Sequence, residues 1–142
     1  MKQTYNNSCM ACVLAMITNT TEDYVFDFFK HYTDDVSPNL SMPDAAIFLA
    51  HHGIFLSSQI NNINSKVIDS KYVAIVAFDR NELLISVESE DLPGYEHAIY
   101  WDGHSIHDPN PNTKKTKIED YKVNFIYPLT RFKNGGTNEN KD

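Results

Sequence analysis

The sequence predicts an α+β domain in which N-terminal helices pack on a C-terminal antiparallel sheet. Three helix-like segments come first, and short apolar runs typical of strands follow them. An Asp-Gly pair at 102–103 separates two of these runs, which is among the strongest local signals of a β-hairpin. Because the helices precede the strands, the pattern differs from the alternating order of a parallel βαβ sheet. The 142 residues are enough for one domain with one core.

Three helices are expected in the N-terminal part of the chain. Residues 9–18 contain Ala, Leu and Met but no Gly or Pro, and the polar residues 6–8 before them are candidate N-cap residues. The second helix is expected to begin at Thr20 or Thr21, because two acidic residues follow and would stand in its first turn. The third is expected to begin near Ser41, with a proline in its first turn, and to end at the next glycine.

The second half of the chain is expected to form strands. Each candidate is a short apolar run bounded by turn residues. The expected strands cover residues 54–56, 72–78, 83–87, 96–101, 104–108 and 124–127. The run at 72–78 is continuously apolar, which is typical of a buried strand. Residues 133–142 are polar and contain two glycines, so the domain is expected to span residues 1–132 and to be followed by a disordered tail.

The charge balance and the short apolar runs argue against two classes of partner. The chain has 12 Lys and Arg against 19 Asp and Glu, a formal net charge of −7. Nucleic-acid-binding proteins usually present a clustered basic face, so no nucleic-acid partner is expected, and the basic residues at 114–117 are predicted to lie in a solvated loop. The apolar runs are far shorter than the ~18 residues of a membrane span. No secretory signal is evident, so a cytoplasmic location is expected.

Cys9 is the candidate nucleophile, because it stands at the start of a predicted helix. Backbone N–H groups and the helix dipole stabilise negative charge there. That position lowers the pKa of a thiol and favours the reactive thiolate. The other cysteine, Cys12, stands nearly one helical turn further on and is predicted to pack in the core. Two cysteines so close together cannot form a disulfide framework, and in a reducing compartment a retained thiol is often a reactive group.

A two-residue loop at 102–103 would place an imidazole beside a carboxylate. Counting back from such a loop, His97 stands opposite Asp108, and opposed residues share a face with Cβ atoms ~4.5–5.5 Å apart. A carboxylate there fixes the tautomer of the imidazole and stabilises its protonated form, as a nucleophilic enzyme requires. Gln3, six residues before Cys9, is a candidate hydrogen-bond donor to an oxyanion next to the thiolate.

Two segments resemble the motifs of papain-like cysteine peptidases. The segment Gln3-Thr-Tyr-Asn-Asn-Ser-Cys9-Met-Ala-Cys-Val-Leu-Ala-Met-Ile resembles the nucleophile motif of that family. The segment His97-Ala-Ile-Tyr-Trp-Asp-Gly-His-Ser-Ile-His-Asp108-Pro109 resembles its His and Asp-Pro motifs. Both are most similar to the short bacterial branch typified by the bacteriocin leader-processing (double-glycine) peptidases.

The resemblance implies a papain-like fold, in which a helix carries the cysteine against an antiparallel sheet that carries the histidine and aspartate. It implies Cys9 as nucleophile, His97 as base, Asp108 as the residue that orients the base, and Gln3 as the oxyanion donor. The implied activity is hydrolysis of a peptide or amide bond in a peptide or protein substrate through an acyl-enzyme, with no cofactor or metal. In so short a chain, specificity is expected to come from a few loops, such as 88–95 and 109–117, or from a partner protein.

Other functions stay open at this point. The same residues support acyltransferase, transglutaminase-type or amidase activity, and a non-catalytic binding or inhibitor protein can be built on the same fold. The segment from Cys9 to Cys12 is also a C-x-x-C motif, but in a thioredoxin-like protein a strand precedes that motif, and only eight residues precede it here. A zinc site would need the cysteines together with the histidines at 51–52, or with those at 104 and 107, which point to opposite faces of a strand.

Overall fold

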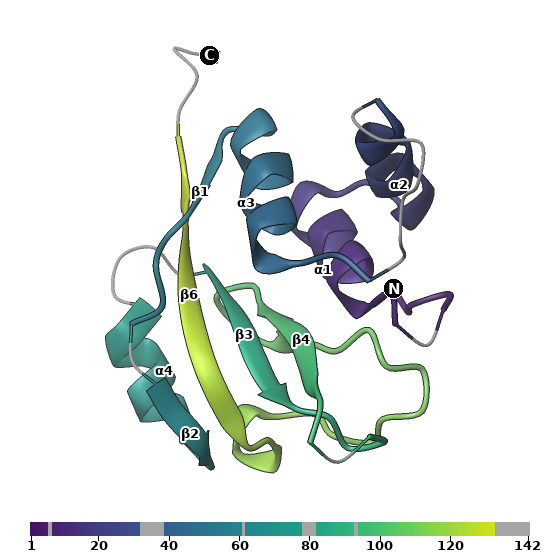
Figure 1. Cartoon of the computed structure of the whole chain (residues 1–142). Coiled ribbons are helices and arrows are strands. Elements are labelled where there is room, and N and C mark those ends of the chain that lie inside the picture. Colours follow the sequence, from purple (N-terminus) through teal and green to yellow (C-terminus); the bar gives the residue numbers. More distant parts are fainter. Residues whose placement is uncertain (6, 32–38, 61, 78–81, 93, 133–142) are drawn as a thin grey trace.

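The computed structural model describes residues 1–5, 7–31, 39–60, 62–77, 82–92 and 94–132. Within them the chain forms an α+β domain with four α-helices and a six-stranded antiparallel sheet (Figure 1). The helices are α1 (Cys9–Thr18), α2 (Glu22–Lys30), α3 (Met42–His51) and α4 (Ser70–Ala77). The strands are β1 (Ile54–Leu56), β2 (Asn62–Lys66), β3 (Glu82–Glu88), β4 (Glu96–Trp101), β5 (Ile106–His107) and β6 (Val123–Arg131). The predicted tail at 133–142 lies outside the described residues.

The sheet has the strand order β1-β6-β3-β4-β5, and β2 also pairs with β6. The long strand β6 is central, because it pairs with β1, β2 and β3. The helices α1, α2 and α3 pack on one face of the sheet, and α4 packs on the other (Figure 1). None of the helices in the described part of the chain is long and apolar enough to cross a membrane.

Strand β3 lies between two hydrophobic clusters. Successive side chains of a strand point to opposite faces, so Leu84 packs in the cluster of α1, α2 and α3, whereas Leu83 and Ile85 pack in the cluster of α4. All five residues from 83 to 87 are buried. Burial on both faces explains why this strand has an almost continuous apolar sequence.

The three N-terminal helices lie where the sequence predicts them. Almost every side chain of α1 from Met10 to Ile17 is buried, which explains its Ala-, Val- and Leu-rich sequence. The Thr21 side chain caps α2 by accepting a hydrogen bond from the N–H of the third residue after it. Ser41 and Asp44 form a reciprocal capping box at the start of α3. These local hydrogen bonds fix where the second and third helices begin.

The strand predicted at 72–78 is wrong, because residues 70–77 form helix α4. The Asp69 side chain accepts a hydrogen bond from the N–H of Tyr72 (2.8 Å), as an N-cap residue does. Val73 and Ala77, four residues apart, are buried, whereas Ile75 between them is 71% exposed. A strand would have placed these three side chains on one face. The pair Asp69-Ser70 before the run is typical of a helix start, but the continuous apolar run after it suggests a strand.

The sheet differs from the prediction in three further ways. Strand β2 is not predicted from the sequence. Strand β6 is longer than the predicted 124–127, because it pairs with β3 on one side and with β1 and β2 on the other. Helix α4 lies between β2 and β3, so the helices do not all precede the strands.

The hairpin between β4 and β5 has a longer turn than the sequence predicts. Trp101 pairs with Ile106, so four residues, 102–105, connect the strands instead of two. The Asp102 carboxylate accepts hydrogen bonds from the N–H groups of His104 (2.8 Å) and Ser105 (2.9 Å). These bonds stabilise the wider turn, as Asp side chains commonly do. The predicted opposition of residues 97 and 108 in the register is therefore wrong, and strand 104–108 is reduced to residues 106–107.

Candidate active site

Cys9 is the first residue of α1, and the loop before it is held by Ser8. The Ser8 hydroxyl accepts a hydrogen bond from the N–H of Tyr5 (3.0 Å) and lies 3.1 Å from the carbonyl oxygen of the same residue. Ser8 stands at the N-cap position, as one of the predicted candidates, but its side chain makes no cap hydrogen bond. The Ser8 hydroxyl therefore leaves the first N–H groups of the helix without a side-chain cap. One of these groups, the backbone N–H of Met10, interacts with the Cys9 sulfur.

His97 lies on β4, in the part of the strand that does not pair with β5. Strand β5 pairs with Tyr100 and Trp101, beyond His97 on β4. The start of α1 reaches β4 here, so the Cys9 thiol interacts with both the His97 side chain and the Ala98 backbone N–H. A helix end and a sheet edge together bring the predicted nucleophile and the predicted base into contact.

Asp108 holds His97 from the other side. The Nε2 atom of His97 lies 2.6 Å from Oδ1 of Asp108. A carboxylate only accepts hydrogen bonds, so Nε2 carries the proton and Nδ1 is the ring nitrogen left for the thiol. The same carboxylate accepts hydrogen bonds from the Asn110 N–H (2.8 Å) and from the Tyr121 hydroxyl (2.7 Å). Asp108 is buried, and these three donors satisfy it.

Tyr121 is a site residue that the sequence analysis misses. Its ring is 1% exposed, and its hydroxyl donates to the carboxylate that orients His97. It follows directly after the 3₁₀ helix η1 (Ile118–Asp120), in a segment where no motif marks it. Its place beside Asp108 results from the packing of the chain between β5 and β6.

The charges of the three residues support one another. Burial raises the pKa of the Cys9 thiol, but its hydrogen bonds with His97 and the Ala98 N–H lower that pKa by more. Burial lowers the pKa of His97, but its bonds to Asp108 and Cys9 raise it to about 9. Burial also raises the pKa of Asp108, yet the hydrogen bond and charge of His97 keep it below its ordinary value. The arrangement therefore favours the charged form of each group, namely a thiolate, an imidazolium and a carboxylate.

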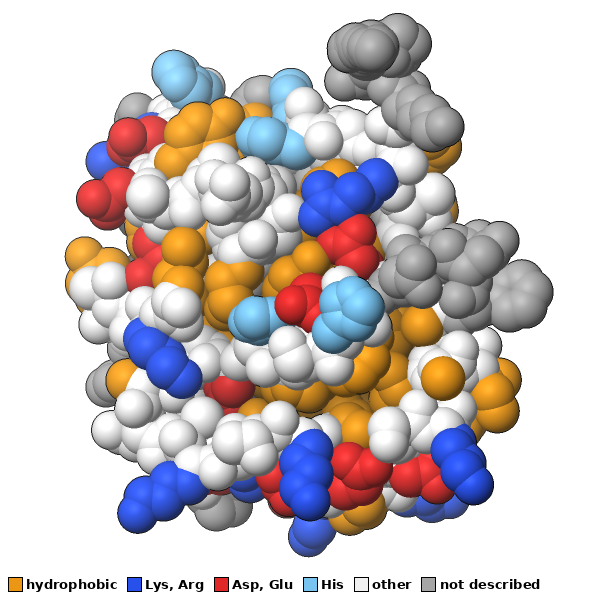
Figure 2. Space-filling view, turned by 180° about the vertical axis from the view of Figure 1, so that it is seen from behind, with side chains coloured by type: hydrophobic (Ala, Val, Ile, Leu, Met, Phe, Trp, Pro, Cys, Tyr) orange, Lys and Arg blue, Asp and Glu red, His pale blue; other side chains and the backbone are white. Residues whose placement is uncertain are grey.

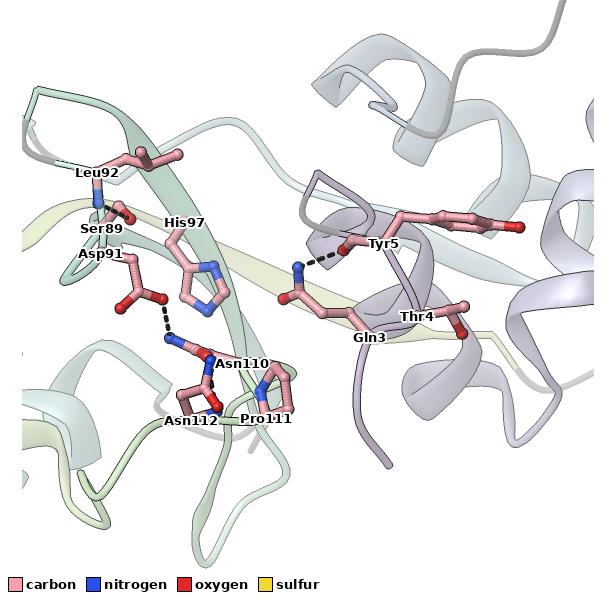
Figure 3. Close-up of a pocket in the computed structure, with 10 residues that line it drawn as sticks. All are labelled: Gln3, Thr4, Tyr5, Ser89, Asp91, Leu92, His97, Asn110, Pro111 and Asn112. Carbon is pink, nitrogen blue, oxygen red and sulfur yellow. Dashed lines mark hydrogen bonds between the residues drawn. The ribbon is translucent and has the colours of Figure 1, made fainter.

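Gln3 is fastened beside this set of residues by the N-terminal segment. Its backbone N–H donates to the Pro109 carbonyl (2.8 Å), and its side-chain Nε2 donates to the Tyr5 carbonyl (2.8 Å). The Lys2 ammonium also donates to the carbonyl of Asp108 (3.1 Å). Figure 3 shows the Gln3 amide facing the cavity that His97 also lines. The structure thus places the predicted oxyanion donor on the same side of the site as the predicted base.

Two cavities flank His97. The first, of about 280 Å³, is mostly polar and combines the N-terminal segment with residues of the loops 88–95 and 109–117 (Figure 3). It is lined by His97 together with Gln3, Tyr5, Asp91, Asn110 and Asn112. The second, of about 180 Å³, lies on the side of α1 and is lined by both Cys9 and His97. His97 thus lines both cavities, whereas Cys9 lines the second and not the first.

Cys12 does not share the environment of Cys9. It is fully buried, and both cysteines are free thiols. Burial and the negative charge of Glu22 raise the pKa of Cys12 to about 12, so it is a neutral thiol at ordinary pH. The packing role predicted for Cys12 agrees with this burial.

The other histidines lie apart from the two cysteines. His107 pairs with Asp102 (2.6 Å) in the hairpin, and His52 contacts the carbonyl of Phe48 (2.9 Å). Among the described residues, no group of three His, Cys, Asp or Glu side chains could hold a metal ion. Figure 2, which views the molecule from behind, shows histidine side chains beside an acidic side chain. On the same face the Lys and Arg side chains are scattered or lie next to acidic side chains.

The aromatic residues near His97 belong mainly to the core. Tyr100 is buried against the N-terminal helices, and Trp101 packs against the cluster of α4. Tyr95 alone of the three is exposed, at 68%. Tyr100 and Trp101 therefore belong to the core of the domain rather than to a wall around the imidazole.

Comparison with models of known protein families, with curated proteins and with solved structures found no match to this chain. The chemistry of the site is therefore inferred from its residues and their geometry.

Proposed function

We propose that the chain is a small papain-like thiol hydrolase that cleaves a peptide or amide bond through an acyl-enzyme. One observation carries the proposal. The His97 ring bridges a buried carboxylate at Asp108 and a thiol at a helix start, Cys9, with pKa shifts that favour the charged form of each. A nucleophilic enzyme needs these three roles in this order.

In the proposed reaction the Cys9 thiolate attacks the carbonyl carbon of the scissile bond. A C–S bond forms, and the electron pair of the C=O bond moves onto oxygen. The Cys9 backbone N–H and the Gln3 amide stabilise this oxyanion. The C–N bond then breaks, and the leaving amine takes the proton from the His97 imidazolium. A thioester between Cys9 and the acyl group remains.

The second half of the reaction regenerates the enzyme. His97, now neutral, takes a proton from water as the water oxygen attacks the thioester carbonyl. The C–S bond breaks, the acid product leaves, and Cys9 is again a thiolate beside an imidazolium. If an amine attacks instead of water, the same steps give acyl transfer. The nucleophile that reaches the thioester therefore decides between hydrolase and transferase.

Trapping the acyl-enzyme tests the proposal without knowledge of the natural substrate. With an activated ester such as p-nitrophenyl acetate, we expect a burst of about one equivalent of nitrophenol and an acetyl thioester that peptide mapping locates on Cys9. Cys12→Ala is the matched control and should keep the burst, whereas Cys9→Ala should lose it. His97→Ala should slow it by about 10²-fold or more. Slow acetylation of both cysteines at similar rates would overturn the proposal.

A further inference from the structure

The cavity on the α1 side of Cys9 has an apolar floor and roof. Side chains alternate along strands, so one face of the sheet supplies Leu84 of β3 and Ala98 of β4. The start of α1 and the segment 40–42 cover this floor. The apolar lining consists of Met10, Leu40, Met42, Leu84, Ala98 and Tyr127. With a volume of about 180 Å³, the cavity has room for one side chain.

The lining of this cavity also contains polar side chains, and one of them, Glu96, is a solvent-exposed carboxylate. Glu96 is on the same face of β4 as Ala98 and accepts a hydrogen bond from the Ser86 hydroxyl of β3 (2.5 Å). Tyr127 lines the same cavity, and burial together with the charge of Glu96 raises its pKa. The Ser86 hydroxyl holds the carboxylate in place through one of its two oxygens.

A second carboxylate stands directly opposite the first. Glu88 of β3 is the register partner of Glu96. Like charges opposite each other destabilise a sheet, and the Ser65 hydroxyl is the donor that Glu88 uses. The described residues that line the cavity include no Lys or Arg. His97 also lines the cavity, but its ring is paired with the Asp108 carboxylate.

We propose that this cavity binds a substrate side chain with an apolar stem and a cationic end, as in lysine or arginine, next to the scissile bond. The inference rests on the proposed function, because it places that side chain beside the thioester carbon. The methylenes of such a chain bury against the apolar lining, and its cation meets Glu96, with Glu88 nearby. A ligand cation there relieves the repulsion between the two carboxylates.

The test compares three chloroacetamides with matched alkyl chains that end in an ammonium, a methyl or a carboxylate group. Each alkylates a thiolate: the S–C bond forms, and chloride leaves with the electrons of the C–Cl bond. Iodoacetamide, which has no chain, measures the reactivity of the thiol itself. Each rate at Cys9 is divided by the iodoacetamide rate of the same variant, so that the ratio reports the cavity alone.

We expect the cationic reagent to react roughly tenfold faster than the anionic one with the wild-type protein, and this ratio to fall to within about twofold in Glu96→Gln. Asp27→Asn is the matched control, because Asp27 is an exposed residue of α2 and its loss changes the net charge equally. The control should keep the wild-type ratio.

Three results would overturn the inference: a ratio near one in the wild type, an unchanged ratio in Glu96→Gln, or an equal fall in Asp27→Asn. Failure of the proposed function has a different signature, namely slow reaction of Cys9 with iodoacetamide at neutral pH. The reagent ratio is measured again at a pH of about 9.5, where an ordinary thiol is ionised as well. The cavity is thereby tested even if the thiol is not activated.

Discussion

The Nε2 atom of His97 lies 2.6 Å from Oδ1 of Asp108, although the two residues are not register partners in the β4–β5 hairpin. The wider turn shifts the register by two residues relative to a two-residue loop. A shift by one residue would turn every side chain to the other face, whereas a shift by two keeps each on its face. The imidazole and the carboxylate therefore still converge.

We expect Cys9 to react with iodoacetamide about tenfold faster than an ordinary thiol at pH 7, because the His97 ion pair lowers its pKa. Its rate should stay high well below the ordinary thiol value of 9.0. Cys12→Ala should behave as the wild type. In Asp108→Asn the His97 pKa falls, so less thiolate should form at pH 7. A Cys9 rate that rises only near pH 9 would contradict the ion pair.

Tyr121→Phe should destabilise the protein by about 1.5–3 kcal/mol, because it removes a hydrogen bond to a buried carboxylate. The pKa of Asp108 should rise, since one of the groups that lower it is lost. Urea denaturation measures the first effect, and the pH profile of Cys9 alkylation reports the second. Tyr95→Phe, at an exposed ring, is the control and should change neither.

Cys9→Ala should change how stability depends on pH. The raised His97 pKa contributes stability that is fully present below the ordinary value of 6.5 and is lost as the pH rises through about 9. The lowered Cys9 pKa contributes stability that is present above 9.0 and is lost as the pH falls, so the two effects oppose each other in the wild type.

In Cys9→Ala only the His97 effect remains, and it is smaller, because Cys9 is one of the groups that raise the His97 pKa. Above pH 6.5 the free energy of unfolding of the variant should fall relative to the wild type, by at most about 1.4 kcal/mol per pH unit, up to a His97 pKa that lies below the wild-type value of about 9. Urea denaturation at several pH values measures this difference, in which contributions from other titrating groups cancel. Parallel pH dependences in the two proteins would contradict a raised His97 pKa.

Gln3→Ala should slow acylation by about 10²–10³-fold, because it removes a donor to the oxyanion. Alkylation by iodoacetamide forms no oxyanion, so its rate at Cys9 should change by less than about twofold. The measurements are the nitrophenol burst and the alkylation rate of the same variant. An equal loss of both rates would mean that Gln3 supports the local structure rather than the oxyanion.

Two substitutions in α4 test the helix against the strand that the sequence suggests. Val73→Ala should cost about 2 kcal/mol, because Val73 is fully buried. Ile75→Ala should change stability by less than about 0.5 kcal/mol, since Ile75 is 71% exposed and Ala is a good helix former. Thermal or urea denaturation measures both, and similar losses would indicate a strand with both side chains on one buried face.

The predictions that succeeded depend on interactions between residues close in sequence. The caps at Thr21 and Ser41 and the apolar composition of 9–18 mark the helices. The prediction failed at 70–77, where a continuous apolar run suits both a strand and a helix. It failed also at the hairpin turn, where the Asp102 side chain accepts hydrogen bonds that stabilise a wider turn. The Asp-Gly pair in the sequence does not predict these bonds.

The sequence by itself determined the α+β class, the place of Cys9 at a helix start, and the spacing that lets His97 meet Asp108. Only the tertiary structure decided that the Tyr121 hydroxyl reaches the carboxylate, that α4 covers the second face of the sheet, and that Glu96 lines a cavity beside the thiol. The reason is physical: caps and alternation act over a few residues, whereas these contacts join elements far apart in the chain, and the packing of both faces of the sheet selects them.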